Sequence, residues 1–414
     1  MVDNKALFAE RQKRYYDTIA LRKTDRVPIV PMVDTFPIRY YGAKMEKAIN
    51  DHGILDDLWL RFHEEFQPDI GDTPYFINGF FGISSILDFR LLKWAGHGLD
   101  DDASYQFVED EMMLPEQYDW FLSDPSDFMF RHMFPKVYGR LAPLAKLPPI
   151  TGSYYFFTPY IWAALADPDI QDAGRALAEA AQESMSTLGK MAHYHQALAE
   201  AGWPLPQGAM TQAPLDIVGD YLRGIKGMLV DLRRRPEKLL AACDKLLPHM
   251  LDLAIGNVRI SGIPICFIPL HKCMDNFMSQ AQFEKFYWPT LLELMRALVA
   301  EKISPYLLIE GVCDTRLPIM IRDAPPGMCV YHIENSDIFE AKKLARDKVC
   351  LRGNVPASIL STGTPDDVRG YCKRLIDEVA VGGGFIMDTA VNLTEARPEN
   401  VKAMFDYTKE HGAY

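Results

Sequence analysis

The sequence predicts an α/β protein built as a (β/α)8 barrel, and three observations support this fold class. The 414 residues suffice for one domain of barrel size. Short apolar runs alternate with helical patterns along most of the chain, as they do where helices join parallel strands. No helical pattern begins with G-x-G-x-x-G or G-x-x-x-x-G-K-[ST], so no dinucleotide or nucleoside triphosphate is expected. We therefore expect one domain over residues 1–414, with its chemistry at the carboxyl ends of the strands.

Eight segments are predicted to form the strands. After an N-terminal helical pattern, the apolar stretch Arg26–Asp34 predicts the first strand, and the irregular stretch Pro68–Phe81 is expected to hold the second. The other six are more uniformly apolar, as buried parallel strands are. They lie at Gln207–Pro214, Ile263–Cys273, Tyr306–Cys313, Met328–Glu334, Val349–Val355 and Gly383–Val391.

The helical patterns between these strands have recognisable starts. Pro236 and Pro365 stand at the first turn of two of them, each followed by an acidic residue, and both features suit a helix N-terminus. Residues 90–203 depart from the alternation, because they are amphipathic, rich in Tyr and Phe, and contain one long helical pattern. We expect a largely helical insertion at about 90–203 over the barrel mouth, with the aromatic run 154–160 as a candidate lid lining.

Composition excludes several classes of function. A net charge of −12 gives no general attraction to nucleic acid. No run of about 18 apolar residues that could span a membrane is present. The charged N-terminus lacks the features of a secretory signal, which predicts a cytoplasmic protein. Seven cysteines in such a chain indicate free thiols and metal ligands rather than a disulfide framework.

Four side chains at the ends of the fourth and fifth predicted strands are candidate metal ligands. His271 and Cys273 end one strand, and Glu310 and Cys313 end its neighbour. Imidazole, thiolate and carboxylate are the groups that zinc takes in proteins. Their spacing matches no compact zinc signature, so buried core positions are an alternative for the two cysteines. Glu310 is the strongest candidate, since a carboxylate after an apolar run is costly to bury unless it is paired or metal-bound; it is also the expected catalytic residue.

Other polar residues at strand ends are candidate substrate contacts. Asp34 follows the first strand, Gln212 lies in the third, and His332 and Asn335 lie at the end of the sixth. The carboxyl ends of barrel strands face one cavity, so these side chains are expected to surround a substrate. Polar packing of loops is the alternative for each of them, and His332 is also a candidate to support a metal ligand.

Four motifs near the C-terminus carry a family resemblance. They are G-N-V-P at Gly353–Pro356, G-T-P at Gly363–Pro365, G-G-F-I at Gly383–Ile386 and P-E-N at Pro398–Asn400. In this order they resemble the C-terminal part of the uroporphyrinogen decarboxylase superfamily. The similarity extends more weakly to Arg26–Asp34 and to Met210–Gly224. It implies the same (β/α)8 fold that the strand pattern predicts.

Two branches of this superfamily make different predictions. The decarboxylases carry an arginine-rich motif after the first strand, where this chain has only Arg39. The zinc methyltransferases that act on thiols carry H-x-C after the fifth strand, where Glu310 replaces the histidine, and a later cysteine, where this chain has Ala390. These departures resemble the methyltransferase components of corrinoid-dependent O-demethylases.

The resemblance implies a zinc-dependent methyltransferase that moves a methyl group from a small O-methylated, aromatic substrate to cob(I)alamin. His271, Cys273, Glu310 and Cys313 would supply the zinc ligands, and a corrinoid protein would carry the cobalamin as a partner. A metal-free decarboxylase or lyase, a methylcobalamin:thiol methyltransferase and a non-catalytic subunit that binds the corrinoid protein are the alternatives. The oligomeric state stays open, with a homodimer as one candidate.

Overall fold

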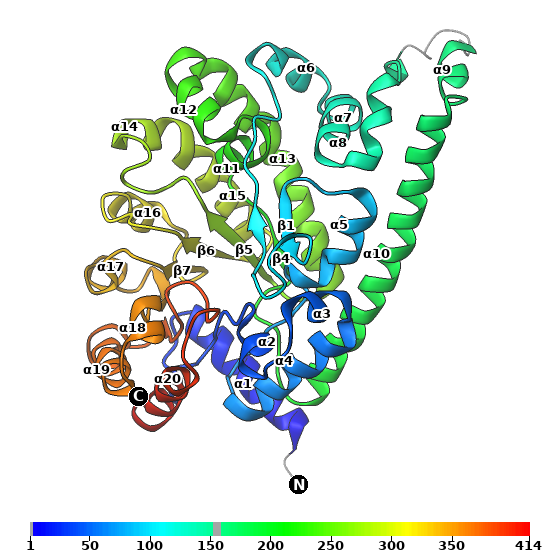
Figure 1. Cartoon of the computed structure of the whole chain (residues 1–414). Helices are drawn as coiled ribbons and strands as arrows, with labels where there is room; N and C mark the ends of the chain where they lie inside the picture. Colours follow the sequence, from blue (N-terminus) through cyan, green and yellow to red (C-terminus); the bar gives the residue numbers. More distant parts are fainter. Residues whose placement is uncertain (1–2, 152–158) are drawn as a thin grey trace.

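A parallel six-stranded sheet forms the centre of the molecule in the computed structural model, which describes residues 3–151 and 159–414 (Figure 1). The strands lie side by side in chain order. They are β4 (Ala209–Met210), β5 (Ile265–Leu270), β6 (Ser304–Ile309), β7 (Cys329–Ile333), β8 (Val349–Gly353) and β9 (Phe385–Ile386). Each lies within or overlaps one of the last six predicted strands, so the α/β class is confirmed.

The first two predicted strands form isolated hydrogen bonds rather than regular ladders. Ile29 forms a parallel bridge with Met387 beyond β9. The Asp69 N–H donates to the Ile29 carbonyl over 2.9 Å, and the Gly71 N–H donates to the Pro204 carbonyl over 2.8 Å. Prolines in both segments remove ladder donors, which explains why no regular strand forms there. The eight segments therefore follow the predicted order, but the structure shows a continuous ladder only for β4 to β9.

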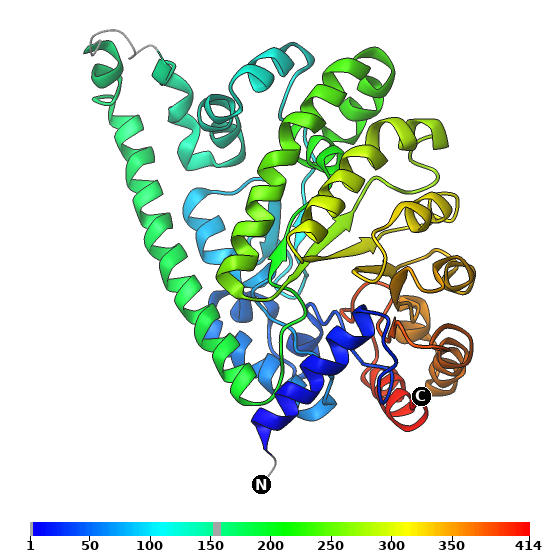
Figure 2. The ribbon, with the colours of Figure 1, turned by 180° about the vertical axis from the view of Figure 1, so that it is seen from behind.

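Alternate residues of the strands face a common interior. Val30, Ile70, Phe267, Tyr306 and Ile386 belong to one buried cluster that draws on both irregular segments as well as the sheet. The intervening strand residues belong to a second cluster, which they form with the surrounding helices. Helix α1 (Asn4–Ile19) closes one end of the interior through Tyr15 and Ile19, and Figure 2 shows it in dark blue below the strands.

Helices join the strands as the sequence predicts. The principal ones are α11 (Pro214–Ile217), α12 (Gly224–Arg234), α13 (Pro236–Ser261), α15 (Trp288–Ala300), α16 (Leu317–Asp323), α17 (Ile338–Ala345), α18 (Ala357–Thr362), α19 (Pro365–Arg374) and α20 (Pro398–His411). Pro236 and Pro365 begin α13 and α19, which confirms the two predicted starts. Among the described helices, none combines the length and the apolar composition that a membrane span requires.

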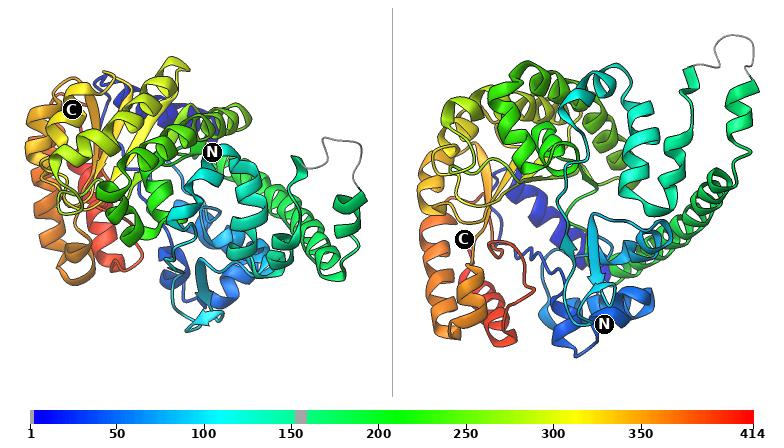
Figure 3. Two further views of the ribbon diagram at one scale, coloured as in Figure 1. Left: turned by 90° about the horizontal axis from the view of Figure 1, so that it is seen from above. Right: turned by 45° about the horizontal axis from the view of Figure 1, so that its top comes forward.

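Residues 90–203 contain a small sheet as well as helices. Its strands are β1 (Leu92–Ala95), β2 (Gly98–Leu99) and β3 (Gln106–Phe107), which the sequence analysis did not predict because they are short and partly exposed. Helix α10 (Pro168–Glu200) is 33 residues long and runs along one side of the molecule (Figure 3). Most of the aromatic run 154–160 lies outside the described residues, and the single-domain boundary stays a prediction.

Candidate functional site

Cys273 and Cys313 meet directly beyond the ends of two neighbouring strands. The register of β5 and β6 pairs Leu270 with Ile309, which brings the following loops side by side. The two Sγ atoms lie 2.9 Å apart, and both side chains are fully buried. Both cysteines are free thiols. The predicted juxtaposition of these two residues is therefore present in the structure.

The loop after β6 is shaped by backbone contacts that position Cys313. The Cys313 N–H donates to Ser336 Oγ over 2.7 Å, and the Gly311 N–H donates to the Glu334 carboxylate. Gly311 has a φ of +69°, and an added Cβ would lie 2.4 Å from Met274 Sδ. Glycine is therefore favoured at 311, because its left-handed φ would strain any other residue and the Met274 side chain would have to move away from an added Cβ.

His271 and Glu310 face each other beside the thiols. His271 Nδ1 lies 2.5 Å from Asp220 Oδ2, and His271 Nε2 lies 3.6 Å from Glu310 Oε1. Burial disfavours the charged imidazole, but the hydrogen bond to Asp220 and the charges of Asp216 and Glu310 outweigh it and raise the pKa of His271 to about 9. Burial raises the pKa of Glu310 to about 7, against the opposing charge of His271.

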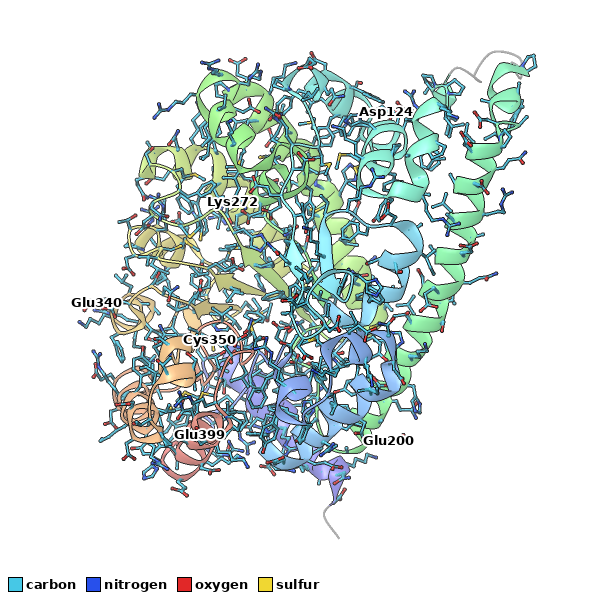
Figure 4. The ribbon with its side chains drawn as sticks, viewed as in Figure 1. Asp124, Glu200, Lys272, Glu340, Cys350 and Glu399 are labelled. Atoms are coloured by element: carbon cyan, nitrogen blue, oxygen red, sulfur yellow. The ribbon has the colours of Figure 1, made fainter. Side chains whose placement is uncertain are left out.

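Two aspartates that the sequence analysis did not identify hold this histidine in place. Asp216 is fully buried in α11 and accepts hydrogen bonds from the His271 N–H at 3.2 Å, the Lys272 N–H at 3.0 Å and the Tyr287 hydroxyl at 2.6 Å. Asp220 also pairs with the Lys272 ammonium, which Figure 4 labels near the end of β5. Asp216 and Asp220 are four residues apart within Met210–Gly224, and this spacing, which places both acids on one helical face, is the sequence feature that could have identified them.

The donor chemistry of this cluster fits zinc. Two adjacent thiols, an imidazole and a carboxylate are its usual ligand types, and Asp220 supports the histidine as second carboxylates do in zinc sites. Burial and the neighbouring Cys313 hold the pKa of Cys273 well above its usual value, so a cation would have to displace the thiol proton. Within residues 3–151 and 159–414, no three such donors are yet grouped as a metal site. His271 or Glu310 would therefore have to approach the thiols to complete one.

A cavity of about 90 Å³ lies within the same interior, on the side of the two irregular segments. Asp34, Asp72, Tyr306 and Arg352 contribute to its lining. Asp34 Oδ2 accepts hydrogen bonds from Thr394 Oγ1 at 3.0 Å and from Asn392 Nδ2 at 3.2 Å, and burial raises the pKa of Asp34. Asp34 thus occupies a position suited to the predicted substrate contact.

The other three predicted substrate contacts lie outside this lining. Gln212 Nε2 lies 3.5 Å from Asp220 Oδ2, so Gln212 belongs to the histidine cluster. His332 is fully buried, and its ring contacts the Tyr306 hydroxyl at 3.0 Å and the Thr389 carbonyl at 2.7 Å. Burial and the nearby Arg352 lower the pKa of His332 to about 3, so its ring is neutral. Asn335 is exposed on the loop after β7. Their roles toward a substrate stay predictions.

Asp72, in the cavity lining, is expected to make the unfolding free energy of the protein depend on pH. Burial raises the pKa of Asp72 to about 7, with Asp34 adding to the rise and Arg352 opposing it. Because this value lies above that of an unfolded aspartate, the stability linked to neutral Asp72 is complete below about pH 4 and is lost as pH rises toward 7. We expect the unfolding free energy of Asp72→Asn, measured relative to that of the wild type, to increase by about 3 kcal/mol as the pH rises from 4.5 to 8.

Urea denaturation of both proteins at several pH values measures this difference. The exposed Asp57→Asn variant is the matched control and should follow the wild type at every pH. A free-energy gap between wild type and Asp72→Asn that stays constant with pH would show that Asp72 is ionised throughout.

The structure is that of an α/β protein whose strands follow each other in the order expected for a barrel. It contains a cluster of candidate metal ligands at the strand ends and a cavity within the barrel interior. The chain belongs to the uroporphyrinogen decarboxylase (URO-D) family, whose model matches residues 171–411, more than half of the chain. This confirms the resemblance found in the sequence.

Two known proteins illustrate the similarity. A uroporphyrinogen decarboxylase from Chlorobium phaeobacteroides is 25% identical over 140 residues, a match that spans 32% of this chain and only 38% of that protein. The structure of a methyltransferase from Methanosarcina mazei superposes with a TM-score of 0.61 at 15% identity, covering 97% of this chain and 98% of that one. At this identity the structural likeness shows the shared fold.

Proposed function

We propose that the protein is a zinc-dependent methyltransferase that moves a methyl group from an O-methylated, aromatic donor to cob(I)alamin on a corrinoid protein. The observation that carries this proposal is the buried pair of thiols, Cys273 and Cys313, with His271 and Glu310 beside it. The fold shared with a methyltransferase supports the same reaction class. In the reaction, the methyl carbon–oxygen bond breaks, a methyl carbon–cobalt bond forms, and the phenolate leaves and takes up a proton.

In this reaction, some residues of the chain would bind the metal and the donor, and others would orient the metal ligands. Cys273, Cys313 and Glu310 would hold zinc with His271, and the bound metal would supply Lewis acidity toward the ether oxygen. Asp220 fixes the His271 ring through Nδ1, so that Nε2 faces Glu310. The cavity beside Asp34 would receive the aromatic ring and exclude water from it.

The test is methyl transfer from simple methoxyarenes to reduced cobalamin. Purified protein, never exposed to chelator, is first analysed for metal and then incubated with methoxybenzene or 4-methoxyphenol and cob(I)alamin. We expect about one zinc per chain and formation of methylcobalamin with release of the phenol. Metal-free wild-type protein that forms no methylcobalamin across a broad panel of methoxyarenes would overturn the proposal.

A metal-free decarboxylase is the second candidate, because it is favoured by the family and by a cavity that contains two aspartates and an arginine. The one arginine that follows the first strand, Arg39, is exposed and pairs with Glu395, so it does not line the cavity. Turnover of a tetrapyrrole carboxylate by zinc-free protein would establish this candidate over the first.

A further inference from the structure

Helix α10 carries an apolar strip on the side that faces away from the rest of the protein. Its inner side packs through Ala173, Ala176 and Ala180 in one cluster and through Tyr194 and Leu198 in another. Figures 1 and 2 both show α10 along the edge of the molecule. A surface helix normally has charged and polar side chains on its outer side. The outer side of α10 instead has five exposed apolar residues, here called the α10 seam: Ala178, Ala181, Met185, Leu188 and Ala192.

The spacing of the α10 seam is that of a helix that packs against another helix. Successive members are three, four, three and four residues apart, which is the repeat that keeps two helices in contact along their length. Met185 is 72% exposed and Leu188 is 46% exposed, so the two largest members of the seam face solvent in the single chain. A second helix laid along the seam would remove both side chains from water.

Gly189 is a second, independent observation at the same place. It lies inside α10, where glycine lowers helix stability relative to alanine. A Cβ added at Gly189 would meet no atom within 4 Å in the described part of the chain, so packing within the chain does not require glycine there. Glycine does allow another backbone to approach closely. Its position next to Leu188 therefore points to a surface from outside this chain.

The α10 seam is complementary to itself when the partner helix runs in the opposite direction. An antiparallel copy can place Met185 beside Leu188 of the other chain, and Leu188 beside Met185. Ala181 then lies beside Ala192 of the other chain on both sides of this centre. Large residues meet large residues and small residues meet small ones, as a two-fold axis requires when both copies use the same surface.

The polar residues beside the seam favour the same direction. Glu179, Lys190 and His193 are exposed on one flank of the seam, where Glu179 pairs with Arg140 of its own chain. An antiparallel copy brings Glu179 of each chain next to Lys190 and His193 of the other, whereas a parallel copy would place like groups together. Since a net charge of −12 makes two copies repel each other in general, an uncharged seam beside opposite charges is a face where they can meet.

We propose that α10 pairs with α10 of a second copy of this chain, antiparallel, about a two-fold axis between Met185 and Leu188. Each copy contributes one helix face, so the interface is small and the dimer is reversible rather than obligate. The inference is independent of the proposed function, because no residue of the α10 seam belongs to the thiol cluster or lines the cavity.

The test is sedimentation velocity of the full chain at concentrations from about 1 to 100 µM. We expect the wild type to shift from monomer toward dimer over this range. Met185→Glu should raise the dimer dissociation constant at least about tenfold, because it would bury a carboxylate in the interface. Leu344→Glu, on α17 at a site that is 45% exposed, is the matched control and should dimerise as the wild type does. A wild type that stays monomeric throughout, or a dimer that Met185→Glu leaves intact, would overturn the proposal.

Cysteine cross-linking tests the direction of pairing. All seven native cysteines are buried, so an introduced thiol on α10 is the exposed one. With the oxidant diamide, which takes up the two electrons and two protons of a thiol pair, a mixture of Ala181→Cys and Ala192→Cys should form a disulfide-linked dimer. Ala181→Cys alone and Leu344→Cys alone should remain unlinked. Linkage of Ala181→Cys to itself in preference to Ala192→Cys would overturn the antiparallel arrangement.

Discussion

Replacing Cys273 or Cys313 by alanine is expected to remove zinc from the protein and to lower methyl transfer at least about a hundredfold. Each thiol is fully buried at the end of its strand, and the two sulfur atoms lie 2.9 Å apart. Loss of either would leave a single sulfur donor beside His271 and Glu310. Replacing a residue that only supports a metal ligand already costs about 10- to 100-fold in metal affinity or activity, so loss of a ligand itself should cost more. Elemental analysis and methylcobalamin formation measure the two effects.

Cys266 offers a matched control on β5, the strand that precedes Cys273. It is equally buried, but it lies near the start of β5, at the other end of the strand from the thiol pair. Cys266→Ala should therefore retain about one zinc per chain even if its stability falls. Zinc retained in both Cys273→Ala and Cys313→Ala would contradict a site built on the thiol pair.

The strand positions were predictable because buried parallel strands have nearly continuous apolar sequences. The same periodicity placed Cys273 and Cys313 on neighbouring strand ends, where the structure brings them together. The apolar pattern of Arg26–Asp34 predicts a regular first strand, while the second is expected within the irregular stretch Pro68–Phe81. Prolines at 28 and 31 remove ladder donors from the first segment, and only isolated bonds form there.

The supporting side chains could not be predicted, because their partners are distant in sequence. Asp220 and His271 are 51 residues apart, and no local pattern states that the carboxylate would take the imidazole Nδ1. For His332, the position near a strand end was predicted but its hydrogen-bond partners were not. Its place near a strand end suggested a substrate contact, but Tyr306 and Thr389, from two other segments, occupy both ring nitrogens. Strand order and periodicity give the direction of a side chain, while its partners depend on tertiary packing.

Replacing Asp69 by asparagine is expected to lower the free energy of unfolding by about 3 kcal/mol, in the range for breaking a buried ion pair. Asp69 is 1% exposed, and its Oδ1 accepts from Arg14 Nη1 at 2.7 Å and from Arg26 Nη2 at 2.6 Å. Its Oδ2 accepts from the Ile29 N–H at 2.8 Å. An asparagine cannot balance two guanidinium groups, so the variant would leave positive charge poorly compensated in a buried position.

The size of this effect follows from the position of Asp69 between three segments. Its carboxylate joins α1, the first irregular segment and the second, where the regular strand ladder is absent. Urea denaturation measures the loss, and Asp57→Asn, which alters an exposed ion pair with an N–O distance of 3.9 Å, should change stability by less than about 0.5 kcal/mol. A loss below about 1 kcal/mol in Asp69→Asn would mean that Asp25 and Glu10, the other partners of Arg14, compensate for the missing charge. The N-terminal segments would then be held by apolar packing rather than by this carboxylate.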